Sequence, residues 1–462
     1  MTNYRLHSSP LKLALLSLLL LVVSGAAGGQ VVSDSAITAI LQDRVVTKRA
    51  VGIVAGVLDH GQRKIFTAGT AGVPGVALDG NTVFEIGSIT KVFTASLLAD
   101  MAARGEVKLD DPVAKYLPSM VRMPSRNGRQ ITLLDLATQS SGLPRMPSNF
   151  KPRDENNPYS DYTVAEMYAF LSGYELPRDV GAQYEYSNLG VGLLGHALAL
   201  RAGKTYEALL TERILKPLGM NDTRIILSEA GKARLARGHT AAGVPTANWD
   251  LQTLAGAGAL RSTANDLLKF LAANLDSASK PLGPVLATTR FARRDLDPQM
   301  KIGLNWHILT AFQRPLIWHN GGTGGYRSFI GLDPARERGV VVLSNQSVAP
   351  DDIGVHLLEV RAPITPAPKL RKEIAVDPAL LETYVGVYQL APTFALTITR
   401  EGGFLFGQGT GQPKLQLFAE APTEFFLKEV DAQITFEKDS TGKVTRLVLH
   451  QGGMNVPGVK TK

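Results

Sequence analysis

The stretch EIGSITKVFTASLLAD, from Glu85 to Asp100, places a serine and a lysine three residues apart at the start of an apolar segment. Its pattern predicts a helix from about residue 88, and residues three apart on a helix have Cβ atoms about 5–6 Å apart. Ser88 and Lys91 should therefore be in contact. Because the neighbours of Lys91 are mostly apolar, packing of this helix would bury its charge, which is costly unless the charge has a use.

A buried lysine beside a serine has a chemical use. A serine hydroxyl is a poor nucleophile until a base takes its proton, and burial lowers the pKa of a lysine so that its neutral amine can act as that base. Ser88 would lie in the first helical turn, where free backbone N–H groups favour a developing oxyanion. The pattern S-x-x-K also occurs often by chance, so its meaning depends on the rest of the chain.

A second motif is YEYSNLGVGLL, which holds Tyr186 and Asn188 two residues apart in a predicted loop before an apolar helix. Such a loop can direct a phenol and an amide into the same cleft. The structural alternative is a core tyrosine whose hydroxyl has a hydrogen-bond partner.

A third motif is IWHNGGTGGY, in which His319 and Gly321 leave a predicted strand and enter a glycine-rich turn. Glycine lets a backbone approach a ligand closely, and a strand edge can pair with an extended ligand. A glycine-rich hairpin without any ligand is the structural alternative.

The composition of the 462 residues excludes several kinds of site. The net charge of +8 comes without a basic stripe, so we expect no nucleic-acid partner. With no cysteine, thiol nucleophiles and thiolate metal sites are impossible. The eight histidines include no pair at helical ligand spacing, and HExxH is absent. We therefore expect neither a metal site nor a cofactor.

The N-terminus has the layout of a signal peptide. Arg5 and Lys12 precede the apolar run Leu13 to Val23, which is followed by the small residues SGAAGG. The run is shorter than the span of about 20 residues that a membrane crossing normally needs, and an uncleaved anchor is the alternative. We expect residues 1–27 to be removed and the protein to be periplasmic or secreted, without a membrane span.

The remaining chain divides into two domains by pattern. Residues 30–361 begin and end with strand patterns, including hairpins over Asp59-His60-Gly61 and Asp333-Pro334, and carry helical patterns between them. This order predicts an α+β fold in which helices flank an antiparallel sheet. A helix starting at Ser262 or Thr263 is one of these elements.

The second domain follows a proline-rich, charged linker at residues 362–375. This domain spans residues 376–462. Within it, residues 383–450 alternate as short strands with turns, which predicts a small all-β barrel or sandwich. The clearest strand patterns are FALTIT, GFLFGQ, KLQLFA, EFFLK, AQITFEK and VTRLVLH.

In this order the three motifs resemble those of the penicillin-recognising serine hydrolases, which include class C β-lactamases and DD-peptidases. The sequence has S-I-T-K at Ser88, Y-S-N at Tyr186 and H-N-G at His319, together with the family-like phrases LLDLATQSSGLP, ILKPLGMNDT and GALRSTANDLLKF. The resemblance covers residues 35–360. It implies a β-lactamase/transpeptidase-like sheet with an all-α subdomain. The last domain resembles, more weakly, a lipocalin-like module.

The resemblance also implies roles for the motif residues. Ser88 would be acylated. Lys91 and Tyr186 would share the role of base as a coupled pair, and the resemblance leaves open which of the two accepts the proton. Asn188 would hold Lys91 and the substrate amide. Backbone N–H groups of Ser88 and Gly322 would form the oxyanion hole.

His319 and Gly321 would then contact the substrate. The third motif begins with histidine where most class C β-lactamases have lysine. Because histidine titrates near neutrality, His319 should bind a substrate carboxylate in a pH-dependent way. The difference shifts the expected activity from efficient β-lactamase towards DD-peptidase.

The expected substrates are β-lactams or D-Ala-D-Ala-type peptides of peptidoglycan. A carboxylesterase or D-aminopeptidase on the same fold is the first alternative, because the same acyl-serine chemistry accepts other acyl groups. A non-catalytic penicillin-binding sensor or scaffold is the second. The partner of the C-terminal domain is unknown.

Overall fold

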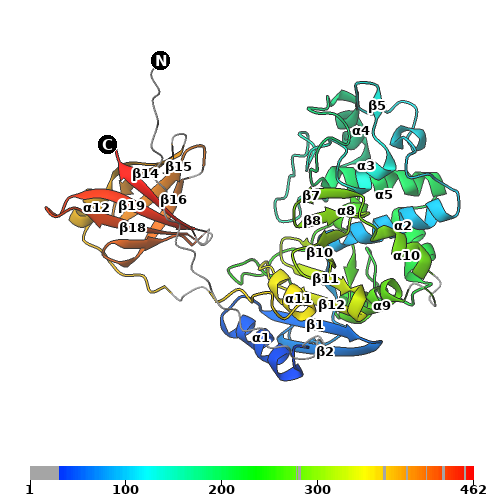
Figure 1. The fold of residues 1–462 in the computed structure, drawn as a ribbon, viewed down its shortest axis with the longest axis horizontal. Coiled ribbons are helices and arrows are strands. Elements are labelled where there is room, and N and C mark those ends of the chain that lie inside the picture. The colour runs from blue at the N-terminus through cyan, green and yellow to red at the C-terminus, as the bar shows by residue number, and fades with distance from the viewer. Residues whose placement is uncertain are drawn as a thin grey trace, which may run out of the picture. The chain divides into compact units, whose positions relative to one another are not determined.

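The computed structural model describes residues 31–462 apart from residues 277, 279–281, 368–370, 392–393, 413, 429–431, 452–453 and 462. The predicted signal peptide lies outside these described residues. The chain forms two compact units, the first ending at Thr365 and the second beginning at Pro366. The first unit combines helices with a sheet, and the second is a barrel (Figure 1).

An antiparallel sheet forms the centre of the first unit, and its described strands follow the order β2-β1-β12-β11-β10-β9-β8-β7. The strands are β1 (Gly52–Asp59), β2 (Gln62–Gly69), β7 (Arg294–Asp297), β8 (Met300–Ile302), β9 (His307–Leu309), β10 (Leu316–Gly322), β11 (Arg327–Asp333) and β12 (Arg338–Ser344). Both predicted hairpins are present, as β1–β2 and β11–β12. Because β1 pairs with β12, strands from the two ends of the domain meet inside one sheet, as the pattern predicts.

Helices cover both faces of this sheet. Ile53, Ala55 and Val57 of β1 pack with α1 (Asp34–Val46) and α11 (Asp351–Leu358) in one apolar cluster, whereas Val54 and Leu58 pack on the other face with α9 (Ala264–Leu275). Side chains of a strand alternate between faces, so the nearly continuous apolar run of β1 supplies both cores. Thr263 is the N-cap of α9 and accepts a hydrogen bond from the Asp266 N–H, which settles the predicted start.

Helix α2 (Thr90–Ala103) is the buried centre of the helical region, and every residue from Thr90 to Met101 is buried. A helix that is surrounded by protein needs apolar residues on all sides, which explains the sequence after Lys91. Around it lie α3 (Leu133–Ala137), α4 (Val164–Gly173), α5 (Asn188–Ala202), α6 (Tyr206–Leu210), α7 (Glu229–Lys232), α8 (Ala255–Gly258) and α10 (Gly283–Thr289). Two short pairs, β3 (Phe84–Glu85) with β6 (Arg261–Ser262) and β4 (Ser125–Arg126) with β5 (Arg129–Gln130), complete the unit.

The second unit is a closed antiparallel barrel whose described strands pair in chain order from β13 to β20. After α12 (Pro378–Tyr384) come β13 (Gly386–Ala391), β14 (Phe394–Glu401), β15 (Phe404–Gly409), β16 (Lys414–Ala421), β17 (Glu424–Phe426), β18 (Ala432–Lys438), β19 (Val444–Gln451) and β20 (Met454–Lys460). The six predicted strand patterns are β14 to β19. The sequence patterns missed β13 and β20, which close the barrel by pairing with each other at Tyr388 and Lys460.

Candidate active site

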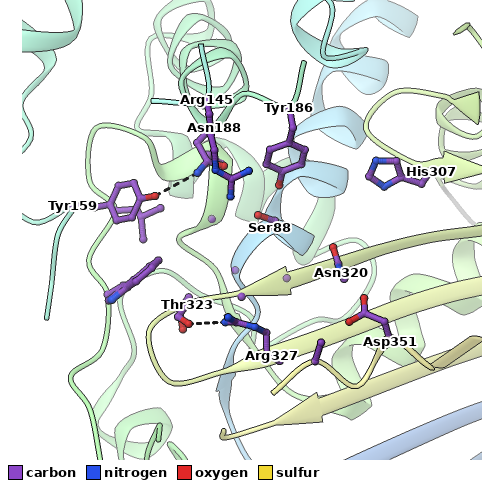
Figure 2. Close-up of a pocket in the computed structure, with 18 residues that line it drawn as sticks. Ser88, Arg145, Tyr159, Tyr186, Asn188, His307, Asn320, Thr323, Arg327 and Asp351 are labelled. Atoms are coloured by element: carbon purple, nitrogen blue, oxygen red, sulfur yellow. Dashed lines mark hydrogen bonds between the residues drawn. The ribbon is translucent and has the colours of Figure 1, made fainter. Parts of the chain in front are cut away.

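The three sequence motifs meet at a cavity of about 450 Å³ in the first unit. Ser88, Tyr186, Asn188, Gly321 and Gly322 line it, from segments far apart in the chain (Figure 2). Lys91 and His319 are fully buried behind the wall of the cavity. The structure therefore brings all seven predicted site residues to one region, although it exposes only some of them to the cavity.

Glycines allow the serine turn to lie against the face of β10. Ser88 sits in a 3₁₀ turn, Gly87–Ile89, that leads directly into α2. Gly87 has a φ of 49°, and a Cβ atom on it would lie 2.6 Å from the Gly322 nitrogen. A Cβ atom on Gly321 would lie 2.0 Å from the carbonyl oxygen of Ile86. Side chains at either glycine would push the turn and strand apart, so the glycines keep Ser88 beside the Gly322 backbone.

Lys91 Nζ is 3.0 Å from Ser88 Oγ, 2.8 Å from Asn188 Oδ1 and 2.7 Å from the carbonyl oxygen of Ala257. Burial, and then the positive charge of Arg145, lower the pKa of Lys91 well below its usual value. The neutral amine has two N–H groups and one lone pair. Because the two carbonyl oxygens can only accept, they take both N–H groups, and the lone pair is left for the Ser88 hydroxyl proton.

Tyr186 is hydrogen-bonded to the same serine hydroxyl. Its ring centre is 4.7 Å from Lys91 Nζ and 5.0 Å from Arg145 Cζ. Burial raises the pKa of the phenol above its usual value, against a smaller lowering by its hydrogen bond with Ser88. Compared with the same groups in water, the two pKa shifts favour the neutral amine of Lys91 and the protonated phenol of Tyr186.

Asn188 is the first residue of α5, and the helix start determines its position. Ser187 is the N-cap, and its Oγ accepts the N–H of Gly190 at 2.8 Å. The Asn188 side chain accepts from Lys91 through Oδ1 and donates from Nδ2 to the hydroxyl of Tyr159 at 3.3 Å. Both partners agree on the orientation of the amide, which connects Lys91 to the wall of the cavity.

His319 differs from the sequence-based expectation. Its ring is 1% exposed and does not line the cavity, whereas its neighbour Asn320 does. Adjacent side chains of a strand point to opposite faces, so β10 places only one of the two towards the cavity. Burial, His307 and Lys91 together lower the pKa of His319 well below its usual value. This direction argues against a change of its charge near neutrality, while the pH-dependent binding of a carboxylate and the contact of His319 with substrate stay predictions.

The motifs missed several residues that line the cavity. They include Arg145, Tyr159, Trp249, His307, Arg327 and Asp351. Arg145 directly follows the family-like phrase ending in Pro144, which was the available signal. Arg327 likewise directly follows the third motif, which ends at Tyr326, whereas no comparable pattern marks the others.

Two of these missed residues have pKa values that burial shifts. Burial and the charge of Lys91 lower the pKa of His307 to about 4, and its buried Nδ1 has no partner among the described residues. Burial raises the pKa of the Asp351 carboxyl. The cavity wall therefore adds a neutral imidazole and a desolvated carboxyl to the predicted groups.

Comparison with known proteins identifies the fold. The family model described as "Beta-lactamase" matches residues 37–361, and a "Domain of unknown function (DUF3471)" matches residues 370–457. The chain belongs to the beta-lactamase family. Proteins named as β-lactamase and D-Ala-D-Ala carboxypeptidase, which are serine hydrolases, are among its relatives. The chain is a serine hydrolase of this family.

Two curated relatives show the extent of the similarity. The "D-alanyl-D-alanine-carboxypeptidase/endopeptidase AmpH" of Escherichia coli K12 is 32% identical over 64% of this chain and 80% of its own length. A "Beta-lactamase" of Pseudomonas fluorescens is 27% identical over 68% of this chain and 93% of its own length.

Two solved structures give the same result. The β-lactamase/D-alanine carboxypeptidase of Yersinia pestis, complexed with citrate, has a TM-score of 0.61 and 25% identity, covering 71% of this chain and all of that one. The class C beta lactamase of Rhodobacter sphaeroides has a TM-score of 0.57 and 26% identity, and the match covers 67% of this chain and 94% of that one. These matches confirm the predicted family and the β-lactamase-like part of the fold, and the closed barrel confirms the rest of the predicted fold class.

Two further findings concern membrane-spanning helices and metal sites in this chain. Among its described residues, no helix has both the length and the apolar character that a membrane crossing requires. In the same residues, no group of three or more histidine, aspartate or glutamate side chains is placed to hold a metal ion.

Proposed function

We propose that this protein hydrolyses amide bonds of β-lactams and D-Ala-D-Ala-type peptides through an acyl-Ser88 intermediate. The observation that carries the proposal is the 3.0 Å contact between Lys91 Nζ and Ser88 Oγ, with the remaining hydrogen bonds of Lys91 made to two carbonyl oxygens. The substrate class follows from the relatives named as β-lactamases and D-alanyl-D-alanine carboxypeptidases.

The proposed acylation begins with a proton transfer. Neutral Lys91 accepts the Ser88 hydroxyl proton as Oγ attacks the carbonyl carbon of the substrate. Tyr186, hydrogen-bonded to the same hydroxyl, passes a proton to the leaving nitrogen. Backbone N–H groups of Ser88 and Gly322 stabilise the oxyanion. Water then attacks the acyl carbon and gives a proton to the Tyr186 phenolate, while protonated Lys91 returns its proton to the departing Ser88 Oγ.

The remaining predicted residues position the substrate. The Asn188 amide binds the substrate amide while it holds Lys91, and Gly321 leaves the edge of β10 free for an extended peptide. His319, whose pKa is lowered by burial, contributes a hydrogen bond or packing beneath this strand instead of a cation. Arg145 and Arg327, which line the cavity, supply the positive charge that suits a substrate carboxylate.

One preparation tests the proposal against its alternatives. We expect a fluorescent penicillin to label the protein covalently, and the label to be lost on a time scale of minutes to hours as the acyl-enzyme hydrolyses. Steady release of D-alanine from a D-Ala-D-Ala peptide, or of opened β-lactam, should accompany it. Labelling without any turnover would indicate a penicillin sensor, and turnover of esters alone would indicate a carboxylesterase.

We propose further that the protein is exported to the periplasm or secreted. The support is the basic start, short apolar run and small-residue exit within residues 1–27. N-terminal sequencing of the native protein should begin between about Ala26 and Gln30. An intact Met1 recovered from the cytoplasmic fraction would contradict export.

A further inference from the structure

Gln139 holds the chain on both sides of Tyr186. Its carbonyl oxygen accepts the Glu185 N–H at 2.7 Å, and its side-chain Oε1 accepts the Ser187 N–H at 2.7 Å. The residue between these two donors is Tyr186. One residue thus constrains the peptide groups that determine where the phenol points.

Gln139 keeps this arrangement at a cost in backbone conformation. It is 2% exposed and has a φ of 56°, in the left-handed region that residues other than glycine and asparagine seldom adopt. Such strained buried residues persist only where the surrounding structure holds them, and they cluster at functional sites.

The other end of the Gln139 side chain contacts the segment that leads into β9. Its Nε2 donates to Asn305 Oδ1 at 2.9 Å. Asn305 is fully buried, also has a positive φ of 57°, and donates its N–H to the carbonyl oxygen of Ala137 at 2.8 Å. Two residues later the chain reaches His307, which lines the cavity. The bridge therefore joins the loop of Tyr186 to the strand of His307.

We propose that Gln139, with Asn305, is a positioning residue that sets the Tyr186 phenol against Ser88 for proton transfer. The inference rests on the role proposed above for Tyr186. Gln139 does not line the cavity, so it acts through the loop and does not touch the substrate. An error of about 1 Å in the position of a catalytic group can cost about a hundredfold in rate.

The test is a double-mutant cycle on the acylation rate constant of a β-lactam. Gln139→Ala keeps a Cβ atom, so it adds no backbone strain, but it removes both side-chain hydrogen bonds. We expect Gln139→Ala to lower the acylation rate constant by roughly 10–100-fold while the dissociation constant of the non-covalent complex changes little. In a Tyr186→Phe background the same substitution should lower the rate by less than about threefold, because residues that act as one unit are non-additive.

Gln346 is a matched control away from the cavity. It is also 2% exposed, and its Nε2 donates to the carbonyl oxygens of Lys48 and Ala241 at 3.1 and 2.8 Å. Gln346→Ala should change the acylation rate constant by less than about twofold in either background, because sites without shared partners are additive. If Gln139→Ala does not fold, Asn305→Gly removes the other end of the bridge and suits the positive φ. It should show the same loss and the same non-additivity.

The outcomes separate the two proposals. If Tyr186→Phe leaves acylation unchanged, the proposed role of Tyr186 fails. Suppose instead that Tyr186→Phe slows acylation. The inference is overturned if Gln139→Ala lowers the rate constant by the same factor in the Tyr186→Phe background as in the wild type. It is also overturned if Gln139→Ala slows acylation no more than Gln346→Ala does.

Discussion

Ser88→Ala is expected to abolish covalent labelling by β-lactam and fluorophosphonate probes. The alanine side chain has no oxygen to form the acyl bond, and the hydrogen-bond network of Lys91 loses the group that donates the proton. Loss of the nucleophile in serine hydrolases costs on the order of 10⁶ in rate. Labelling would be measured by gel fluorescence and intact mass, with thermal unfolding as a check that the variant is folded.

A second buried serine on α2 provides the control. Ser96 is fully buried and its Oγ donates to the carbonyl oxygen of Val92 at 2.7 Å, remote from the cavity lining. Ser96→Ala should leave labelling unchanged. If Ser88→Ala is folded and still labelled to the wild-type extent, the nucleophile is another residue and the proposed mechanism is wrong.

Lys91→Ala, Tyr186→Phe and the double variant should show similarly large losses in acylation rate. Each single change should cost roughly 10²–10⁴-fold, the usual contribution of a positioned acid or base. The double variant should lose no more than several-fold beyond the worse single one, because both residues serve one proton transfer. The measurement is the pseudo-first-order acylation rate at saturating β-lactam. Cleanly multiplicative losses would show that the two residues act independently.

The pH dependence of the acylation rate distinguishes the Lys91 amine from the Tyr186 phenol. Burial lowers the pKa of Lys91, so its free amine forms at a pH well below the usual range of lysine. Acylation should therefore increase with rising pH as Lys91 loses its proton, and reach a plateau before that usual range. Because burial raises the pKa of Tyr186, the phenol should not titrate on this limb, and Tyr186→Phe should leave its position unchanged. If the rise of the acylation rate with pH disappears in Tyr186→Phe, the group that titrates is the phenol and not Lys91.

The sequence predicted the parts of the site that depend on local geometry. Ser88 and Lys91 are in contact because three residues of helical chain bring them together, even though Ser88 lies in a 3₁₀ turn and α2 begins only at Thr90. The burial of Lys91 was equally readable, since most of the residues around it on the helix are apolar.

The barrel shows how far alternation alone can predict a fold. Strands β14 to β19 alternate clearly and were predicted, because each hairpin is a local structure. Strand β20 contains Pro457 and Gly458, which argue against a strand in isolation. Its pairing with β13 joins the two ends of the unit, and closure is a property of the whole barrel.

Only the tertiary structure decided which side chains of β10 point towards the cavity and which groups bind the Lys91 amine. A strand presents alternate residues to opposite faces, so the sequence could not decide whether His319 or Asn320 meets the cavity. Packing of β10 against the serine turn places Asn320 there and buries His319, which lowers the pKa of its imidazole. Likewise, the Ala257 carbonyl that binds Lys91 lies 166 residues away. A backbone carbonyl carries no sequence signature, so only the folded chain can show that it lies beside a buried amine.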